Sequence, residues 1–192
     1  MAFATRAGWL KAYETVIGAT PACRATSLTV GRRRAEGGIA TPYLCIVTFV
    51  NCETRDLPVS ILSPLPQASL PSVRAAGGGR VVMMGSDLTQ RTDVRWSACS
   101  AAAAAQLTLA FTWAREPAPE RNTVNAVVPG RIPAQRHAGL APGFLVGWTD
   151  RVPLRQLRTS ATVAFGTGWL TFAGGAFITG EQITVHGEHG LT

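Results

Sequence analysis

Charged residues are scarce in this sequence. They make up 15% of its 192 residues, whereas soluble domains carry about 25%. A surface so poor in charge indicates that other protein covers much of it, and we therefore expect an oligomer. No run approaches the roughly 18 apolar residues needed to cross a bilayer, and the N-terminus lacks the apolar core of a signal peptide. A membrane partner is accordingly not expected.

Closely spaced cysteines are also missing. The four cysteines, Cys23, Cys45, Cys52 and Cys99, form no C-x-x-C pair, which argues against a zinc knuckle. Cys45 and Cys99 lie in apolar contexts and are expected to be small buried residues. The absence of an N-x-S/T site points, with the cysteines, to synthesis in a reducing compartment.

The motifs of common enzymes are absent. The sequence contains no G-x-S-x-G, no Walker loop and no G-x-G-x-x-G, and the glycines at 77–79 are read as a hairpin turn. His186 and His189 would point to opposite faces of a strand, and His137 has no visible partner for general-base work. The sequence thus predicts no catalytic residue, no metal, no cofactor and no enzyme.

Lysine is nearly absent, although the chain is basic. Lys11 is the only lysine, and the net charge is +7. A GC-rich genome explains the choice of arginine over lysine, while arginine also pairs bidentately with phosphate. The positive charge favours a polyanionic partner.

What the sequence has is a series of strand-like segments. Ile183 and Val185 alternate with Thr184 and His186 near the C-terminus, which is typical of a half-buried antiparallel strand. Alternation also occurs at 26–30, 107–113 and 161–165. The apolar run at 43–50 indicates a strand covered on both faces, and residues 77–85 indicate a turn that leads into another buried strand. Further short strands are expected at 124–128 and 144–148. The alanines at 101–105 fit either a strand or a single helical turn. Eight to ten short strands indicate a sandwich or jelly roll.

Two groups of arginines are candidate phosphate contacts. Arg32, Arg33 and Arg34 lie together in a glycine-bounded loop. Arg151, Arg155 and Arg158 would share one face if their segment were helical. Both groups are candidate nucleic-acid-binding residues. The alternatives are a solvated loop for the first group and pairing with acids of a neighbouring subunit for the second.

Three segments resemble coat proteins of small icosahedral RNA viruses. Residues 107–119, with the run onward to Gly130, are similar to a strand, tryptophan and proline-rich turn of tymovirus-like coats. Residues 96–105 resemble a small-residue strand of bromovirus coats. Residues 169–191 are similar to the last two strands of such jelly rolls.

The resemblance implies an all-β, eight-stranded jelly-roll sandwich with a short N-terminal helical or extended arm. Residues 1–40 would form the arm and basic loop, and residues 41–192 the shell domain. Trp9, Leu10 and Tyr13, in a helix expected at 8–17, would contact neighbouring subunits.

The implied function is a capsid protein that assembles with many copies of itself and packages an RNA genome. The virion would be assembled in the host cytoplasm. A bacteriophage tail or head-decoration protein is the first alternative, and a cupin-like or lectin-like sandwich is the second.

Overall fold

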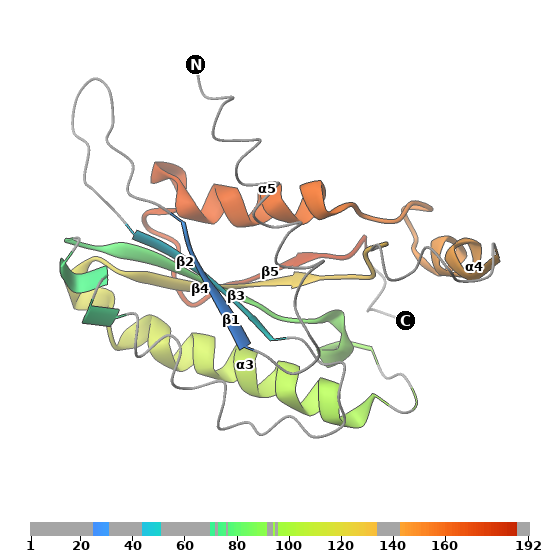
Figure 1. Cartoon of the computed structure of the whole chain (residues 1–192), viewed down its shortest axis with the longest axis horizontal. Helices are drawn as coiled ribbons and strands as arrows, with labels where there is room; N and C mark the ends of the chain where they lie inside the picture. Colours follow the sequence, from blue (N-terminus) through green and yellow to red (C-terminus); the bar gives the residue numbers. More distant parts are fainter. Residues whose placement is uncertain are drawn as a thin grey trace, which may run out of the picture.

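The computed structural model describes residues 25–30, 44–50, 70–71, 73–75, 77–91, 94, 96–133 and 143–187. These residues form a five-stranded sheet with helices on both faces (Figure 1).

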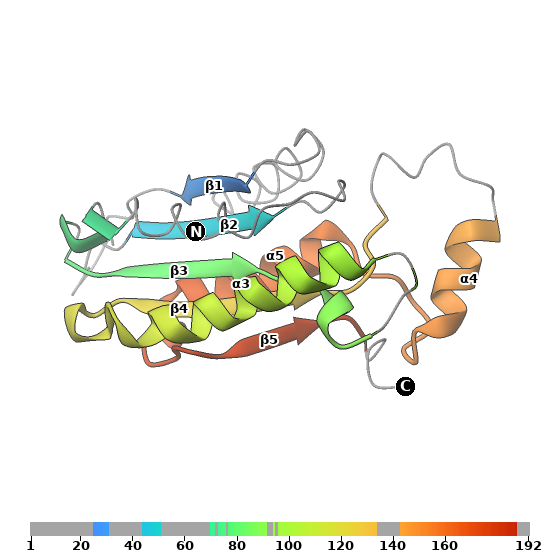
Figure 2. The same ribbon diagram turned by 90° about the horizontal axis from the view of Figure 1, so that it is seen from below.

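The strands lie in the order β1-β2-β3-β4-β5. β1 (Ala25–Val30) runs antiparallel to β2 (Leu44–Val50). β2, β3 (Gly79–Met84), β4 (Thr123–Pro129) and β5 (Gln182–Val185) are parallel to one another. The four parallel strands therefore end on one side of the sheet, which we call the carboxyl edge (Figure 2).

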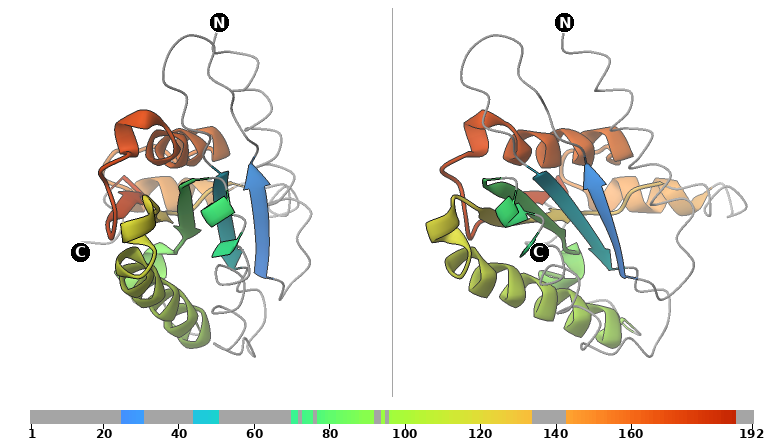
Figure 3. Two further views of the ribbon diagram at one scale, coloured as in Figure 1. Left: turned by 90° about the vertical axis from the view of Figure 1, so that its left-hand side faces the viewer. Right: turned by 60° about the vertical axis from the view of Figure 1, so that its left-hand side comes forward.

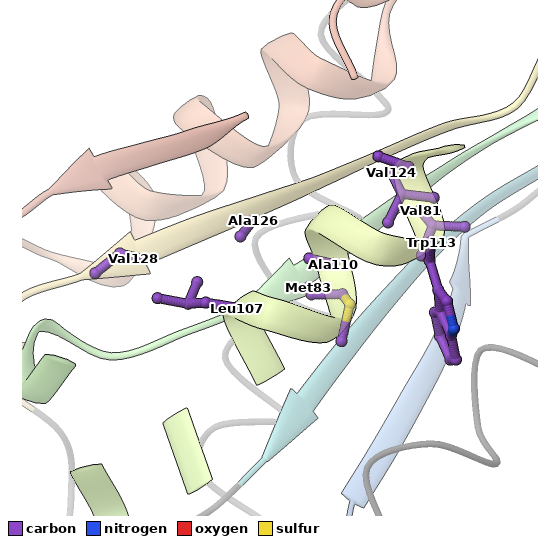
Figure 4. Packing of buried hydrophobic residues seen from close by; sticks show 9 residues of the cluster. Val81, Met83, Leu107, Ala110, Trp113, Val124, Ala126 and Val128 are labelled. Carbon is purple, nitrogen blue, oxygen red and sulfur yellow. The ribbon is translucent and has the colours of Figure 1, made fainter. Parts of the chain in front are cut away.

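The two long helices cover opposite faces of the sheet (Figure 3). They are α3 (Ser97–Arg115) and α5 (Ser160–Thr171). Successive residues of β3 face them in turn: Val81 and Met83 pack with α3, and Val82 and Met84 pack with α5. The α3 core (Figure 4) consists of Val81, Met83, Leu107, Ala110, Trp113, Ala114, Val124, Ala126 and Val128. The α5 core consists of Val82, Met84, Val127, Val163, Ala164 and Leu170.

Helix α3 forms because small residues with high helix propensity repeat at helical spacing. Its buried residues are Cys99, Ala102, Ala103, Gln106, Leu107, Ala110, Trp113 and Ala114. Steps of three and four place them on one stripe, which packs on the sheet. Alanine has the highest helix propensity, and the helix ends at Arg115, shortly before Pro117, because a proline disfavours helical backbone in the residue before it.

The two crossover connections that follow β3 have opposite hands. The chain steps in the same direction along the sheet from β3 to β4 and from β4 to β5. The first step passes through α3 and the second through α5, on the other face. One of the two therefore departs from the right-handed rule that governs nearly all such connections.

The predicted all-β jelly roll was wrong. Segments 107–113, 144–148 and 161–165, predicted as strands, lie in α3, α4 (Gly143–Arg151) and α5. An amphipathic helix is normally recognised by a charged face. Helix α5 has no charged residue. Threonine and alanine fit the helical period of about 3.6 residues as well as the strand period of two, so a short alternation resembled a strand.

Several individual strands were predicted correctly. The strands expected at 26–30, at 43–50, within 77–85 and at 124–128 correspond to β1, β2, β3 and β4. Ile183 and Val185 of β5 pack against the α5 core as their alternation predicted. The antiparallel pairing expected for this last strand was wrong, because β5 pairs parallel with β4. Cys99 is buried, as expected.

Other predictions fall on residues that the structure does not describe. The helix at 8–17, with Trp9, Leu10 and Tyr13, lies outside the described residues, as does the basic loop with Arg32, Arg33 and Arg34. The division at residue 40 stays a prediction. Among the described residues, no helix combines the length and apolar character needed to span a membrane.

Candidate functional site

The carboxyl edge is the candidate functional site. In open α/β sheets, ligands bind outside the carboxyl ends of the parallel strands, where the loops leading to the helices gather. Here Gly85 follows β3, Gly130 follows β4 and His186 follows β5. These residues come from distant parts of the sequence and meet at this edge because the strands are parallel.

Glycine at the ends of β3 and β4 allows close packing. A Cβ atom on Gly85 would lie 3.0 Å from Val128 Cγ2 and 3.1 Å from Leu107 Cδ2. A Cβ atom on Gly130 would lie 2.7 Å from His186 Cβ and 2.9 Å from His186 Cα. The Gly130 amide also donates to the Val185 carbonyl oxygen over 3.1 Å. The end of β4 is thus held directly against the backbone that leaves β5.

The loop after β3 is fixed by short polar contacts. The Ser86 hydroxyl accepts a hydrogen bond from the Leu88 amide at the start of η2 (Asp87–Thr89). The Asp87 carboxylate accepts from Arg91 Nε at 2.8 Å, and the two side chains are 4% and 13% exposed. A shielded ion pair of this kind holds one geometry, so the loop presents a fixed surface at the edge.

A second polar contact joins this loop to the end of β5. His186 Nε2 lies 2.9 Å from Gln90 Oε1, and His186 is 8% exposed. We expected no catalytic or metal-binding role for His186, and the structure buries it. His186 directly follows β5, where Gly130 lies against its Cα and Cβ atoms and Gln90 contacts its imidazole.

A lobe built around α4 projects beyond the carboxyl edge (Figure 2). We call residues 143–158 the α4 lobe. The Arg131 guanidinium, just after β4, lies 4.6 Å from the centroid of the Trp148 ring, a cation–π contact. Val152 is 4% exposed, and a Cβ atom on Gly187 would lie 2.9 Å from Val152 Cγ1. The lobe is therefore attached to the ends of both β4 and β5.

The structure places the second predicted arginine group on this lobe. Helix α4 ends at Arg151, and Arg155 has a left-handed backbone with φ of 52°. The three arginines therefore do not share one helix face, as the spacing had suggested. They nevertheless lie along one short segment, and Arg158 Nη2 would be 3.0 Å from a Cβ atom on Gly187, at the end of β5. Their role as phosphate contacts stays a prediction.

Sequence reasoning missed the residues that organise the edge, namely Gly85, Asp87, Gln90, Gly130 and His186. A signal was present for the two glycines, since each directly follows a continuous apolar run. Such runs are typical of parallel strands buried on both faces. No comparable signal links Gln90 with His186, which are 96 residues apart.

The opposite edge of the sheet carries a different feature. Arg74 Nε lies 2.6 Å from Glu120 Oε2, and this hydrogen bond, with the charge of Glu120, raises the pKa of Arg74 above its usual value. Both side chains are about half exposed, so the pair is a surface contact that contributes little stability. Nothing in the part of the chain that the structure describes groups three or more metal-ligating acids, histidines or cysteines.

Comparison with known proteins identifies relatives of this chain. The family model described as enoyl-(acyl carrier protein) reductase matches residues 60–192. The hydroxy(phenyl)methyl-succinyl-CoA dehydrogenase subunit BbsC of Thauera aromatica is 32% identical over 121 residues, which cover 63% of this chain and 47% of that protein.

Two solved structures share the fold. A short-chain type dehydrogenase/reductase from Mycobacterium ulcerans superposes with a TM-score of 0.66 at 24% identity, over 72% of this chain and 51% of that one. The 3-oxoacyl-(acyl-carrier protein) reductase of Brucella melitensis gives 0.62 at 28% identity, over 69% and 49%. This chain spans about half the length of these relatives.

These matches correct the functional predictions. The capsid protein, its shell of many copies, its RNA partner and its virion location were all wrong, because the matching family model is named for a reductase and the relatives are dehydrogenases or reductases. The bacteriophage and cupin-like or lectin-like alternatives were wrong for the same reason. So was the prediction that the protein is not an enzyme. The apolar alternation that suggested a coat protein belongs to helices packed on a parallel sheet.

The family model covers more than half of the sequence. The described sheet, parallel from β2 to β5 with α3 and α5 on its two faces, agrees with the solved relatives. The chain belongs to the short-chain dehydrogenase/reductase family.

Proposed function

We propose that this chain contributes the substrate side of an oxidoreductase that acts on acyl groups carried as thioesters. The carboxyl edge would hold the acyl group, and the α4 lobe would cover it. The observation that carries the proposal is the position of this lobe, fixed to the ends of β4 and β5 through Arg131 and Val152.

The names of the relatives support the substrate class. The family model and the Brucella protein are named for acyl groups on acyl carrier protein, and the Thauera protein is named for a CoA derivative. In CoA and in acyl carrier protein alike, a phosphopantetheine arm ends in the thiol that bears the acyl group. The shared feature is therefore the thioester on that arm.

The edge has the properties of a binding surface. Its loops are held by the Asp87–Arg91 ion pair and the His186–Gln90 contact, so little reorganisation is needed on binding. Trp96, at the start of α3, is 48% exposed, and Val94 is 87% exposed. These side chains offer apolar surface to an acyl chain at the end of the sheet where ligands bind in this class of fold.

A nicotinamide dinucleotide would be the redox partner in such a reaction, but the described residues do not fit it as a whole. In doubly wound folds the dinucleotide lies where the strand order reverses, with its pyrophosphate at a glycine-rich turn. The described strands run in sequence order without a reversal, and the sequence has no G-x-G-x-x-G. We assign to these residues the binding and orientation of the thioester and no step of hydride transfer.

A binding measurement and a turnover measurement test the proposal. Titration of the chain with acetoacetyl-CoA, followed by tryptophan fluorescence, should show saturation, with a dissociation constant of the order of typical KM values, about 1 μM to 1 mM. Trp96 directly precedes α3 and Trp148 contacts Arg131 just after β4, so both should report binding.

Turnover is followed by the loss of reduced nicotinamide fluorescence with NADH or NADPH present. Loss of acetoacetyl-CoA, as its 3-keto group is reduced to a hydroxyl, matched one for one by nicotinamide oxidation would show that the chain also completes the redox step. If the chain does not bind acetoacetyl-CoA at millimolar concentration, the proposal is wrong.

A further inference from the structure

We propose that arginines of the α4 lobe bind the phosphate groups of the carrier to which the acyl thioester is attached. This inference rests on the proposed function and adds to it the part of the substrate that is recognised by charge. It assigns a ligand to Arg151, Arg155 and Arg158.

The α4 lobe has a strong excess of positive charge. Within residues 143–158 the sequence contains these three arginines and a single acid, Asp150. Arg151 lies in the last turn of α4, where a cation also interacts favourably with the helix dipole. Arg155 and Arg158 lie beyond the helix, so the dipole does not account for them.

Arg155 is held in place with most of its side chain facing solvent. Its Nη1 donates to the Asp150 carbonyl oxygen over 2.8 Å and lies 3.7 Å from Asp150 Oδ1. The side chain is 70% exposed, and the backbone amide donates to the Val152 carbonyl oxygen. A left-handed backbone at a non-glycine residue costs free energy and persists where the surrounding structure enforces it. The turn thus orients a guanidinium group toward solvent.

Arg158 lies where the lobe meets the sheet. Its Nη2 and Val152 Cγ1 both lie about 3 Å from the position that a Cβ atom on Gly187 would occupy. Gly187 itself has φ of 65° and directly follows His186 of the carboxyl edge. Arg158 is partly buried, so its position relative to the end of β5 is fixed. The positive segment therefore extends from solvent at Arg155 to the edge of the candidate site.

The chemistry of the carrier matches this segment. A guanidinium group pairs bidentately with phosphate oxygens, and such charge-assisted hydrogen bonds are stronger than neutral ones. CoA carries a diphosphate and a ribose phosphate, and the arm of acyl carrier protein carries one phosphodiester. If the acyl group lies at the carboxyl edge, the pantetheine arm leads outward from it, and the phosphates follow at the far end, where the lobe projects (Figure 2).

The test compares four acetoacetyl thioesters on the 192-residue chain by calorimetric titration. They are the thioesters of CoA, of dephospho-CoA, of phosphopantetheine and of pantetheine. Replacement of Arg151 and Arg155 by Ala in one variant should weaken acetoacetyl-CoA binding about tenfold or more. The same variant should bind acetoacetyl-pantetheine as the unmodified chain does. Affinity for the CoA thioester should also fall as salt rises, and less so in the variant.

The chain provides a matched control pair. Arg115 is in the last turn of α3, as Arg151 is in that of α4, and Arg121 has a left-handed φ of 61°, close to that of Arg155. The R115A/R121A variant loses the same charge from equivalent backbone positions at the opposite edge of the sheet. It should keep full affinity for acetoacetyl-CoA, and circular dichroism melting checks that both variants are folded.

The outcomes separate the two proposals. Weaker binding of dephospho-CoA than of CoA assigns the ribose phosphate, and hence free CoA, as the ligand. Equal binding of the CoA, dephospho-CoA and phosphopantetheine thioesters, with weaker binding of pantetheine, assigns the phosphate that CoA shares with acyl carrier protein.

Equal binding of all four, or an equal loss in the control variant, overturns the phosphate assignment while acyl-thioester binding stands. Failure of all four to bind contradicts the proposed function itself.

Discussion

At the scale of single residues, Gly130 is the position where the carboxyl edge tolerates least change. A Cβ atom there would lie 2.9 Å from the backbone Cα atom of His186, and backbone cannot move aside as a flexible side chain can. Gly130→Ala should therefore lower the free energy of unfolding by about 1–3 kcal/mol, the usual cost of overpacking. Urea denaturation followed by circular dichroism measures this loss.

Gly147→Ala is the control for that substitution. Gly147 lies within α4, and nothing lies within 4 Å of its Cβ position. The same change should leave stability unchanged or raise it by up to about 1 kcal/mol, because alanine favours a helix over glycine. Equal losses at both positions would show that the contact with His186 is not the cause.

Asn125 fixes the turn that leads into β5. Its Nδ2 donates to the Ile178 carbonyl oxygen over 2.8 Å, and its Oδ1 accepts from the Glu181 amide at 3.1 Å. The side chain is 1% exposed, so both backbone groups lose their partner in Asn125→Ala. We expect a loss of about 2 kcal/mol, measured by thermal or urea unfolding.

Thr108→Ala serves for comparison. The Thr108 hydroxyl also donates one hydrogen bond, to the Ala104 carbonyl oxygen at 3.1 Å, but it is exposed. Water replaces that bond, and alanine favours the helix, so stability should change by less than about 0.5 kcal/mol. A loss at Thr108 as large as at Asn125 would contradict the role given to burial.

At the scale of elements, strands were easier to predict from the sequence than helices. The segments at 43–50, 77–85 and 124–128 are mostly apolar, although they include Thr48, Arg80 and Asn125, and each contains a strand of the parallel sheet. This apolar character, together with the glycines after β3 and β4, is typical of the parallel strands of an α/β fold, which are covered on both faces. We interpreted these segments as strands but gave more weight to the alternation elsewhere, and so assigned them to a sandwich.

The helices were misjudged because their surfaces carry so little charge. Phe165 and Trp169 of α5 are 53% and 50% exposed, so apolar residues occur on both its outer and its inner face. The helical period of a sequence can be detected only when one face of the helix is apolar and the opposite face is polar. The candidate site was less predictable still, since the contact of Gln90 with His186 depends on strand order, which no local pattern encodes.

Helix α5 depends on Leu170 for its attachment to the sheet. Leu170 is fully buried in the α5 core, whereas Leu154, on the α4 lobe, is 57% exposed. Leu170→Ala should lower the free energy of unfolding by about 2–5 kcal/mol. Leu154→Ala should lower it by less than about 0.5 kcal/mol. Similar losses in the two variants would contradict the packing of α5 described above.

At the scale of the whole molecule, the two cores are joined through the strands that separate them. Val81 and Val82 are neighbours in β3, yet one belongs to the α3 core and the other to the α5 core. If the packing on one face of a strand is lost, the register of that strand is no longer fixed, and the packing on its other face is lost too. The two layers should therefore unfold together, as small domains usually do.

Native-state hydrogen exchange checks this expectation. Leu170→Ala, in the α5 core, should lower the protection of amides in β3 and α3 by the same free energy as that of amides in α5. Unchanged protection in α3, with loss confined to α5, would show that the layers are separate cooperative units.

The opposite hands of the two crossovers limit how this sequence can change. To reach the face opposite α3, the chain that leaves β4 must make a long detour, and the α4 lobe is part of it. Deletions that shorten the detour would return the helix to the wrong side of the sheet, while insertions at the tip would leave the layers intact. Relatives of this protein should therefore differ by insertions in this segment more often than by deletions. A change of substrate preference would then come with added residues in this segment.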